Sequence, residues 1–173
     1  EALDSYYESY RGHSSRMWAE KLGLDGFQEG DEGLVSELTS VMQLTETDMT
    51  ILFRTLSTIQ GPDSNHLTRA FYKEEEIPHI EWGSWLARWW DRVDGRPDRE
   101  STLNANPKYV LRNWMAHLAI DAAEKEDYSV ATALYEMLKK PYDEQPGNEE
   151  KWFSRRPEWA RNRVGCSMLS CSS

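Results

Sequence analysis

Apolar side chains recur at intervals of three and four residues along most of this chain, and that spacing predicts α-helices. The first predicted helix covers residues 2–22, and its inward face is expected to hold Leu3, Tyr7, Tyr10, Met17 and Trp18. Gly23 follows this helix and suits a C-terminal cap, where the backbone takes a left-handed conformation. Similar apolar stripes predict helices from Leu34 to Met42, from Met49 to Leu56 and from Ile80 to Val93.

A further helical pattern, from Asn106 to Leu138, predicts a hairpin of two helices. Asn106 can cap the first helix, and Pro107 fits its first turn because a missing N–H costs nothing there. The apolar stripe of this first helix is expected to consist of Val110, Leu111, Trp114, Met115, Leu118 and Ala122. The second helix carries Val130, Leu134, Met137 and Leu138, and Pro141 ends it.

The segments between these helices have weaker patterns. We expect an acidic, Gly-rich loop from Asp25 to Gly33, and residues 45–48 have the character of a capping box. The remaining segments are an ambiguous stretch (64–78), a loop or short turn (94–104), a polar connection (142–152) and a helical turn within 156–163. Because the alternation typical of strands is scarce, the predicted fold class is all-α, with an irregular multi-helix arrangement.

Composition narrows the class of protein. The chain has 173 residues, 39% of them hydrophobic and 12% aromatic, which excludes general disorder. A formal net charge of −10 argues against a nucleic-acid partner, although residues 151–163 form a local basic patch. No apolar run is long enough to span a bilayer, and no signal or transit peptide is recognisable, so no membrane partner is expected. The sequence begins within a helical pattern and without Met, which we interpret as a fragment of a longer protein.

The Trp-rich helix invites a ligand-stacking interpretation. Trp82, Trp85 and Trp89 share one helical face, with Trp90 beside them, and Arg88 and Arg92 could lie over neighbouring rings. The same spacing is that of a core stripe, and aromatic burial dominates cores and interfaces. Core packing, or docking against another domain, is the favoured interpretation.

Three groups of polar residues could form a binding site, but for each a purely structural role is the favoured interpretation. His117 and Asp121 lie one helical turn apart, with Asn113 a turn before, but two ligands are too few for a metal site. Arg112 could bind phosphate, yet more often such an arginine is an ion-pair partner between helices. Residues 74–76 are three consecutive glutamates that fan out around a helix, so a solvated face is expected. We therefore predict no catalytic, cofactor-binding or metal-binding residue in this segment.

Cys166 and Cys171 are the redox candidates. Both lie in a flexible-looking tail rich in Ser and Gly, and no His or Asp is fixed beside either by sequence. Arg161 and Arg163 would favour the thiolate at Cys166, and the spacing allows an intramolecular disulfide, although two inert thiols remain an alternative. With no other cysteine there is no disulfide framework, which favours an intracellular, mostly reducing origin.

Several blocks of sequence, in order, resemble the C-terminal part of the selenoprotein O family. They are Lys21-Leu22-Gly23-Leu24, Phe53-Arg54-Thr55-Leu56-Ser57, Trp85-Leu86-Ala87-Arg88-Trp89, the run from Asn106 to Asn113, and the end Cys171-Ser172-Ser173. The resemblance implies a parent with a pseudokinase fold that transfers AMP from ATP, with Mg²⁺ or Mn²⁺, to Ser, Thr or Tyr hydroxyls of proteins. The implied nucleotide and metal sites match nothing in this segment, whose partners would be its own N-terminal kinase-like core and the protein substrates.

The resemblance also bears on the tail and on the location. Cys171 takes the position that is selenocysteine in some family members, which implies that it is the redox residue; its partner would be Cys166 or a thiol in the core. The expected organisation is a helical region over residues 1–164, packed on the kinase-like core, and a flexible redox tail over 165–173. The parent would be mitochondrial in a eukaryote and cytoplasmic in a bacterium. The alternative to this enzyme segment is a stand-alone helical protein-interaction module without catalysis.

Overall fold

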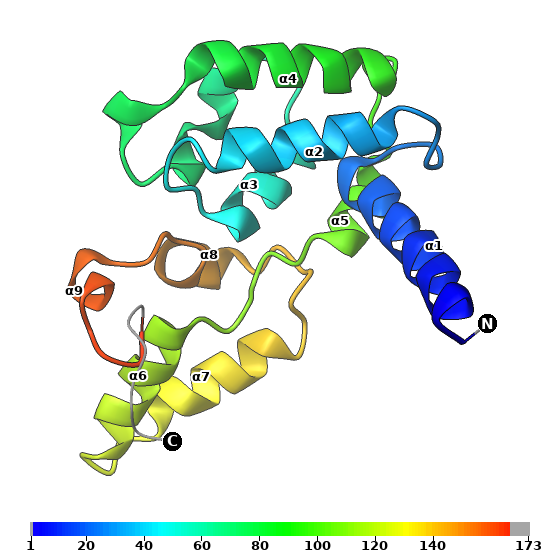
Figure 1. Ribbon diagram of the computed structural model, residues 1–173. Coiled ribbons are helices and arrows are strands. Elements are labelled where there is room, and N and C mark those ends of the chain that lie inside the picture. The colour runs from blue at the N-terminus through cyan, green and yellow to red at the C-terminus, as the bar shows by residue number, and fades with distance from the viewer. Residues whose placement is uncertain (1, 167–173) are drawn as a thin grey trace. The chain divides into compact units, whose positions relative to one another are not determined.

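The computed structural model describes residues 2–166, and this range consists of helices and connections with no strand (Figure 1). The all-α prediction is confirmed. The chain divides into two compact units, Glu1–Asn106 (unit 1) and Pro107–Ser173 (unit 2). None of the described helices combines the length and apolarity needed to cross a bilayer. The expected boundary between residues 164 and 165 stays a prediction, because residues 167–173 lie outside the described part.

Unit 1 contains five α-helices and two 3₁₀ segments among its described residues: α1 (Ala2–Leu22), α2 (Asp31–Met42), α3 (Met49–Leu56), η1 (Ser64–Ala70), η2 (Glu74–Glu76), α4 (His79–Arg92) and α5 (Arg99–Ala105). Helices α2 and α4 lie side by side, and η1 packs against both α3 and α4 (Figure 1). The predicted helices at 34–42, 49–56 and 80–93 are confirmed, and no end differs by more than three residues. Residues 94–104 were expected to be a loop or a short turn, yet the two-turn helix α5 occupies part of them, and Asp98 caps it by accepting from the Ser101 N–H at 3.1 Å.

The core of unit 1 forms around the tryptophans of α4. Trp82, Trp85 and Trp89 are fully buried, together with Leu38 of α2 and Leu52 of α3. The Trp85 and Trp89 rings stack with centroids 5.9 Å apart, and Phe71 meets Trp82 edge to face at 5.5 Å. Burial of side chains this large supplies much of the driving force for folding the unit.

The start of α3 corrects the predicted capping box. Asp48 is itself the N-cap, and its carboxylate accepts from the Ile51 N–H at 3.1 Å. Its own N–H donates to the Ala70 carbonyl at 2.7 Å, within a single antiparallel bridge that joins Thr47 to Phe71. The connection after η1 therefore fixes where α3 begins, which local sequence spacing cannot show.

The inward face predicted for α1 is wrong. Leu3, Tyr7, Tyr10 and Met17 are exposed, and Trp18 is half-buried. Burial begins only at the C-terminal end of α1, at Ala19 and Leu22, where the helix contacts α5 and α3. Gly23 caps the helix as predicted, with φ +66° and a bond from the Leu24 N–H to the Ala19 carbonyl at 2.9 Å.

Unit 2 contains α6 (Asn113–Ala123), α7 (Ser129–Leu138), α8 (Pro146–Trp152) and α9 (Glu158–Arg161) among its described residues. The antiparallel α6–α7 pair is confirmed, but its first helix begins at Asn113 and not at Asn106. Val110 and Leu111 lie before it and are exposed. Helix α8 occupies most of the expected polar connection, with Pro146 at its start, and α9 confirms the helical turn predicted within 156–163.

The segment before α6 is extended and bonds to the turn that follows α7. The Lys108 and Tyr109 N–H groups both donate to the Pro141 carbonyl, at 2.9 and 3.0 Å. The Tyr109 ring is buried against Phe153, and Trp114 stacks on Trp152 with ring centroids 5.9 Å apart. These contacts make 106–112 a structural strap, which the helical interpretation missed.

Candidate functional site

The tryptophans of α4 are committed to the core. The Trp85 Nε1–H donates to the Leu34 carbonyl at 2.9 Å, and the Trp89 Nε1–H donates to the Leu22 carbonyl at 2.9 Å. Trp90 is half-buried, and its indole nitrogen would lie 3.2 Å from a Cβ at Gly95. No face of the three buried rings is open to a ligand, which confirms core packing over ligand stacking.

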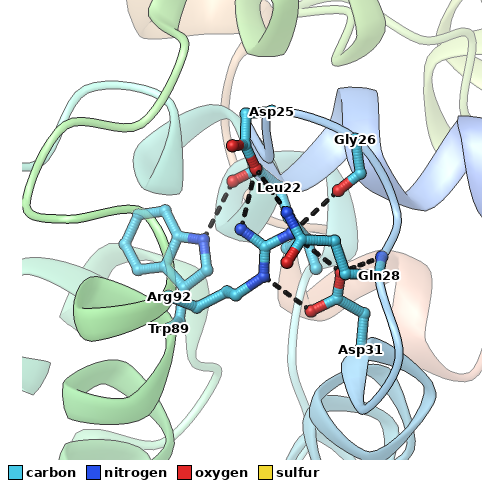
Figure 2. A network of polar contacts seen from close by, with 7 residues as sticks. All are labelled: Leu22, Asp25, Gly26, Gln28, Asp31, Trp89 and Arg92. Atoms are coloured by element: carbon cyan, nitrogen blue, oxygen red, sulfur yellow. Dashed lines mark hydrogen bonds and ion pairs between the residues drawn. The ribbon is translucent and has the colours of Figure 1, made fainter.

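Arg92 holds the loop between α1 and α2 in place (Figure 2). Its guanidinium donates to both carboxylate oxygens of Asp31, at 2.8 and 3.0 Å, and to Asp25 and the Gly26 carbonyl. The expected cation–π role is therefore replaced by a carboxylate network. Asp31 also accepts from the Gln28 N–H at 2.7 Å, so a buried acid is fully bonded.

Electrostatics within this network follow from those bonds. The pKa of Asp25 is lowered, first by its hydrogen bond to Arg92 and then by the charge of that guanidinium. The pKa of Arg92 is raised, chiefly by its bond to Asp31. A cavity of about 210 Å³ lies beside it, lined by Gly23, Asp98 and others, but its central cation is already bonded to three acceptors. The network therefore has a structural role, which is to hold the loop between α1 and α2 against α4.

Lys108 is a buried amine that sequence reasoning missed. Its ammonium donates to Glu144 at 2.6 Å and Glu149 at 2.9 Å, and lies 5.2 Å from the centre of the Phe153 ring. Burial works to lower its pKa, but the two carboxylates outweigh burial and leave the pKa raised. The amine is therefore protonated and serves as an ion-pair partner that links the two carboxylates, and it does not act as a nucleophile. If the extended strap had been recognised from the sequence, Glu144 and Glu149 would have indicated carboxylate partners for Lys108.

Other polar residues of unit 2 also have structural partners. Arg112 donates to the Ser154 carbonyl at 2.8 Å and so ties the strap to the α8–α9 connection, which agrees with a structural role for this arginine. Asp121 pairs with Arg163 through two bonds, at 2.6 and 2.7 Å, and not with His117. The bond from Arg163 is the main cause of the lowered pKa of Asp121.

Acidic and other metal-ligating side chains do not gather into a set among the described residues. No group of three or more His, Cys, Asp or Glu side chains within residues 2–166 is placed to hold a metal ion. Glu74, Glu75 and Glu76 form the exposed η2, as expected, and the acidic pair of Asp25 and Asp31 is bonded to Arg92.

The base of the tail is anchored to α6. Asn113 donates to the Cys166 carbonyl at 3.1 Å, and a Cβ on Gly165 would lie 3.0 Å from the His117 ring. Cys166 is half-buried with a free thiol, and burial raises its pKa while Arg163 acts in the opposite direction. The expected thiolate at Cys166 is therefore disfavoured. Cys171 lies outside the described residues.

A groove lies between α1 and α2 in unit 1. Its volume is about 480 Å³, and it is lined by Tyr10, Trp18, Phe27 and Val35, with Arg11 and Glu32 among its polar residues. Sequence reasoning missed it, because it placed Tyr10 and Trp18 on a buried face. The mixed apolar and charged lining suits a protein segment better than a reaction centre.

Comparison with known proteins gives these features a context. The family model described as "Protein adenylyltransferase SelO" matches residues 1–139. Proteins named "Protein nucleotidyltransferase YdiU" match nearly the whole chain: 47% identity in Flavobacterium johnsoniae over 99% of the chain, 43% in Aromatoleum aromaticum over 100%, and 42% in Rhodopirellula baltica over 97%. Each match covers 35% of the relative, so the chain spans about a third of the length of these relatives.

Proposed function

This chain belongs to the SelO family of protein adenylyltransferases, and from that premise we propose that it is the helical C-terminal segment of a parent enzyme that transfers AMP from ATP to protein hydroxyls. The observation that carries the proposal is the match of the whole chain to nucleotidyltransferases about three times its length. The acceptors would be Ser, Thr or Tyr side chains of protein substrates.

The catalytic part would lie upstream, in a kinase-like core that supplies the sites for ATP and Mg²⁺ or Mn²⁺. The contacts within residues 2–166 support this division of labour, because Arg92, Lys108 and Arg163 are each bonded to carboxylates within their own unit. A residue already neutralised in this way is poorly suited to bind a phosphate group. The segment alone is therefore proposed to be inactive, and its role is to pack on the core.

A labelling experiment tests this proposal. The full-length parent and this segment are each incubated with ATP labelled in the α-phosphate, Mg²⁺ or Mn²⁺, and a general protein acceptor. We expect label in the acceptor with the parent and none above a heat-inactivated control with the segment. Label transferred by the segment alone would overturn its proposed inactivity, and no label with folded parent would overturn AMP transfer.

We also propose that Cys171 is the redox residue of the tail, with Cys166 or a thiol of the core as its partner. The raised pKa and partial burial of Cys166 support this ranking, because reactivity follows the thiolate fraction and access. Differential alkylation with mass spectrometry tests it: after mild peroxide, Cys171 should be found in a reducible disulfide. Faster alkylation of Cys166 than Cys171, with no disulfide, would reverse the assignment. An intracellular location, mitochondrial or cytoplasmic, belongs to the same proposal.

The exposed face of α1 favours a second candidate, a stand-alone interaction module without catalysis. Five of its large apolar side chains are at least 41% exposed, which is unusual for a helix with no partner. Sequencing the region upstream of Glu1 separates the two candidates. A reading frame that continues into a kinase-like region supports the enzyme segment, and a start codon directly before Glu1 supports the module.

A further inference from the structure

Helix α1 presents an apolar surface that unit 1 leaves uncovered. We define the α1 stripe as Leu3, Tyr6, Tyr7, Tyr10 and Met17; the four residues from Leu3 to Tyr10 are each at least 58% exposed. Leu3, Tyr7, Tyr10 and Met17 recur at helical spacing on one side of the helix. Tyr6 stacks on Tyr10 with ring centroids 6.3 Å apart, so the aromatic surface is continuous over about one helical turn.

The stripe continues into the groove between α1 and α2. Tyr10 belongs to both, and Trp18 and Phe27 extend the aromatic lining toward the body of unit 1. Only the far end of α1 is packed, through Ala19 and Leu22. A row of large apolar side chains leading into a hollow of about 480 Å³ has the form of a surface that receives another part of a protein.

The relatives indicate what covers this surface. They are about three times as long as this chain, so about two thirds of their polypeptide lies outside the matched part. Under the proposed function, that remainder precedes α1. A segment joined directly to α1 is present at the stripe at a high effective concentration, on the order of millimolar for short linkers. A second copy of the chain has no such advantage, and each copy carries a net charge of −10, which opposes association.

We propose that the α1 stripe and the adjoining groove form the surface on which the upstream part of the same polypeptide packs. This inference rests on the proposed function, because it identifies the catalytic part of the parent as the partner. An apolar face of that part would cover Tyr7 and Tyr10, and an apolar side chain from it would enter the groove beside Trp18. The segment would thus be held to the catalytic part by the helix that connects them.

Photo-crosslinking in the full-length parent tests the proposal. A benzophenone amino acid replaces Tyr7 in one variant and Tyr6 in a second, so that a single poorly folded variant does not decide the result. Ser5 is the matched control, because it lies two residues from Tyr7 and about 200° around the helix, and it is also exposed. Circular dichroism and AMP transfer are measured on the same samples.

We expect Tyr7 and Tyr6 variants to crosslink within one molecule to residues upstream of Glu1, with several-fold lower yield from the Ser5 variant. Crosslinks to residues 107–166, crosslinks between two molecules, or no crosslink in folded protein would each overturn the proposal. Failure of the proposed function would look different: the upstream crosslinks would form while no AMP is transferred.

Discussion

Arg92 and Asp31 lie 61 residues apart in sequence, and the guanidinium of one faces both carboxylate oxygens of the other at 2.8 and 3.0 Å (Figure 2). The Asp31 side chain is only 4% exposed, against 20% for Arg92. A buried carboxylate that loses its cation keeps the cost of desolvation without the compensating bond. The pair therefore fixes the entry into α2 and its position beside α4.

Replacing Arg92 should lower the free energy of unfolding far more than replacing Arg88 does. Arg92→Met leaves Asp31 buried without its charge partner and should lower the free energy of unfolding by about 3–5 kcal/mol. Arg88→Met is the control, because its ion pair with Glu37 is about half exposed on both sides and should contribute about 0–1 kcal/mol. Urea denaturation measures both, and equal losses would contradict a special role for Arg92.

The two buried indoles at positions 82 and 85 should respond differently to loss of the N–H group. Trp85→Phe replaces the two-ring indole with a single ring and removes the hydrogen bond to the Leu34 carbonyl. Trp82→Phe removes a similar ring volume, but the Trp82 Nε1–H has no partner among the described residues. The Trp85 variant should therefore be less stable than the Trp82 variant by about 1 kcal/mol, in the same denaturation experiment. A Trp82 variant that is the less stable of the two would show that ring shape dominates.

Two glycine-to-alanine substitutions should have opposite signs. At Gly23 the backbone has φ +66°, and an added Cβ would lie 2.9 Å from the Asp98 nitrogen, so Gly23→Ala should destabilise the chain. At Gly83, within α4, an added Cβ meets nothing within 4 Å. Gly83→Ala should stabilise the chain by about 0.5–1 kcal/mol, because alanine is the better helix former. Melting temperatures from calorimetry would check both signs.

The pKa of Asp121 should depend on Arg163. The guanidinium now holds that pKa below its ordinary value near 3.8, so the pair stabilises the fold above pH 3.8 and loses its effect as the pH falls through the lowered pKa. Arg163→Met should raise the pKa of Asp121 toward 3.8 and shift the onset of acid unfolding to higher pH. Carbon-detected NMR of the carboxyl group measures the first effect. Arg161→Met, which removes a neighbouring charge paired with Glu158, should leave the pKa unchanged.

Strong local periodicity was sufficient to predict α4 and its buried tryptophans, because three large rings on one face leave few other arrangements. The same reasoning failed at α1, since an apolar stripe shows that a face is amphipathic but not what covers it. The prediction that a helix begins at Asn106 failed for a different reason. Asn suits either end of a helix, and only the distant bonds of Lys108 and Tyr109 to Pro141 make the following residues extended.

The partners of the candidate polar residues could not be predicted from local spacing. The one-turn spacing of His117 and Asp121 could not reveal Arg163 as the partner of Asp121. Arg92 was recognised as a neighbour of aromatic rings, whereas its carboxylate partners lie on another helix and a loop. Pairings over such distances depend on the packed fold, and no local spacing records them.

Asn106 gives unit 1 a mechanical property. Its side chain bonds to the Lys21 carbonyl at 2.9 Å and lies 3.3 Å from the Ser57 hydroxyl, while Arg54 donates to its carbonyl at 3.0 Å. A pulling force that enters through Pro107 is therefore shared at once between the ends of α1 and α3. Unit 1 should therefore resist unfolding from this end. In a single-molecule stretching experiment, the force should rise to one abrupt rupture, and α5 should not unfold gradually before it.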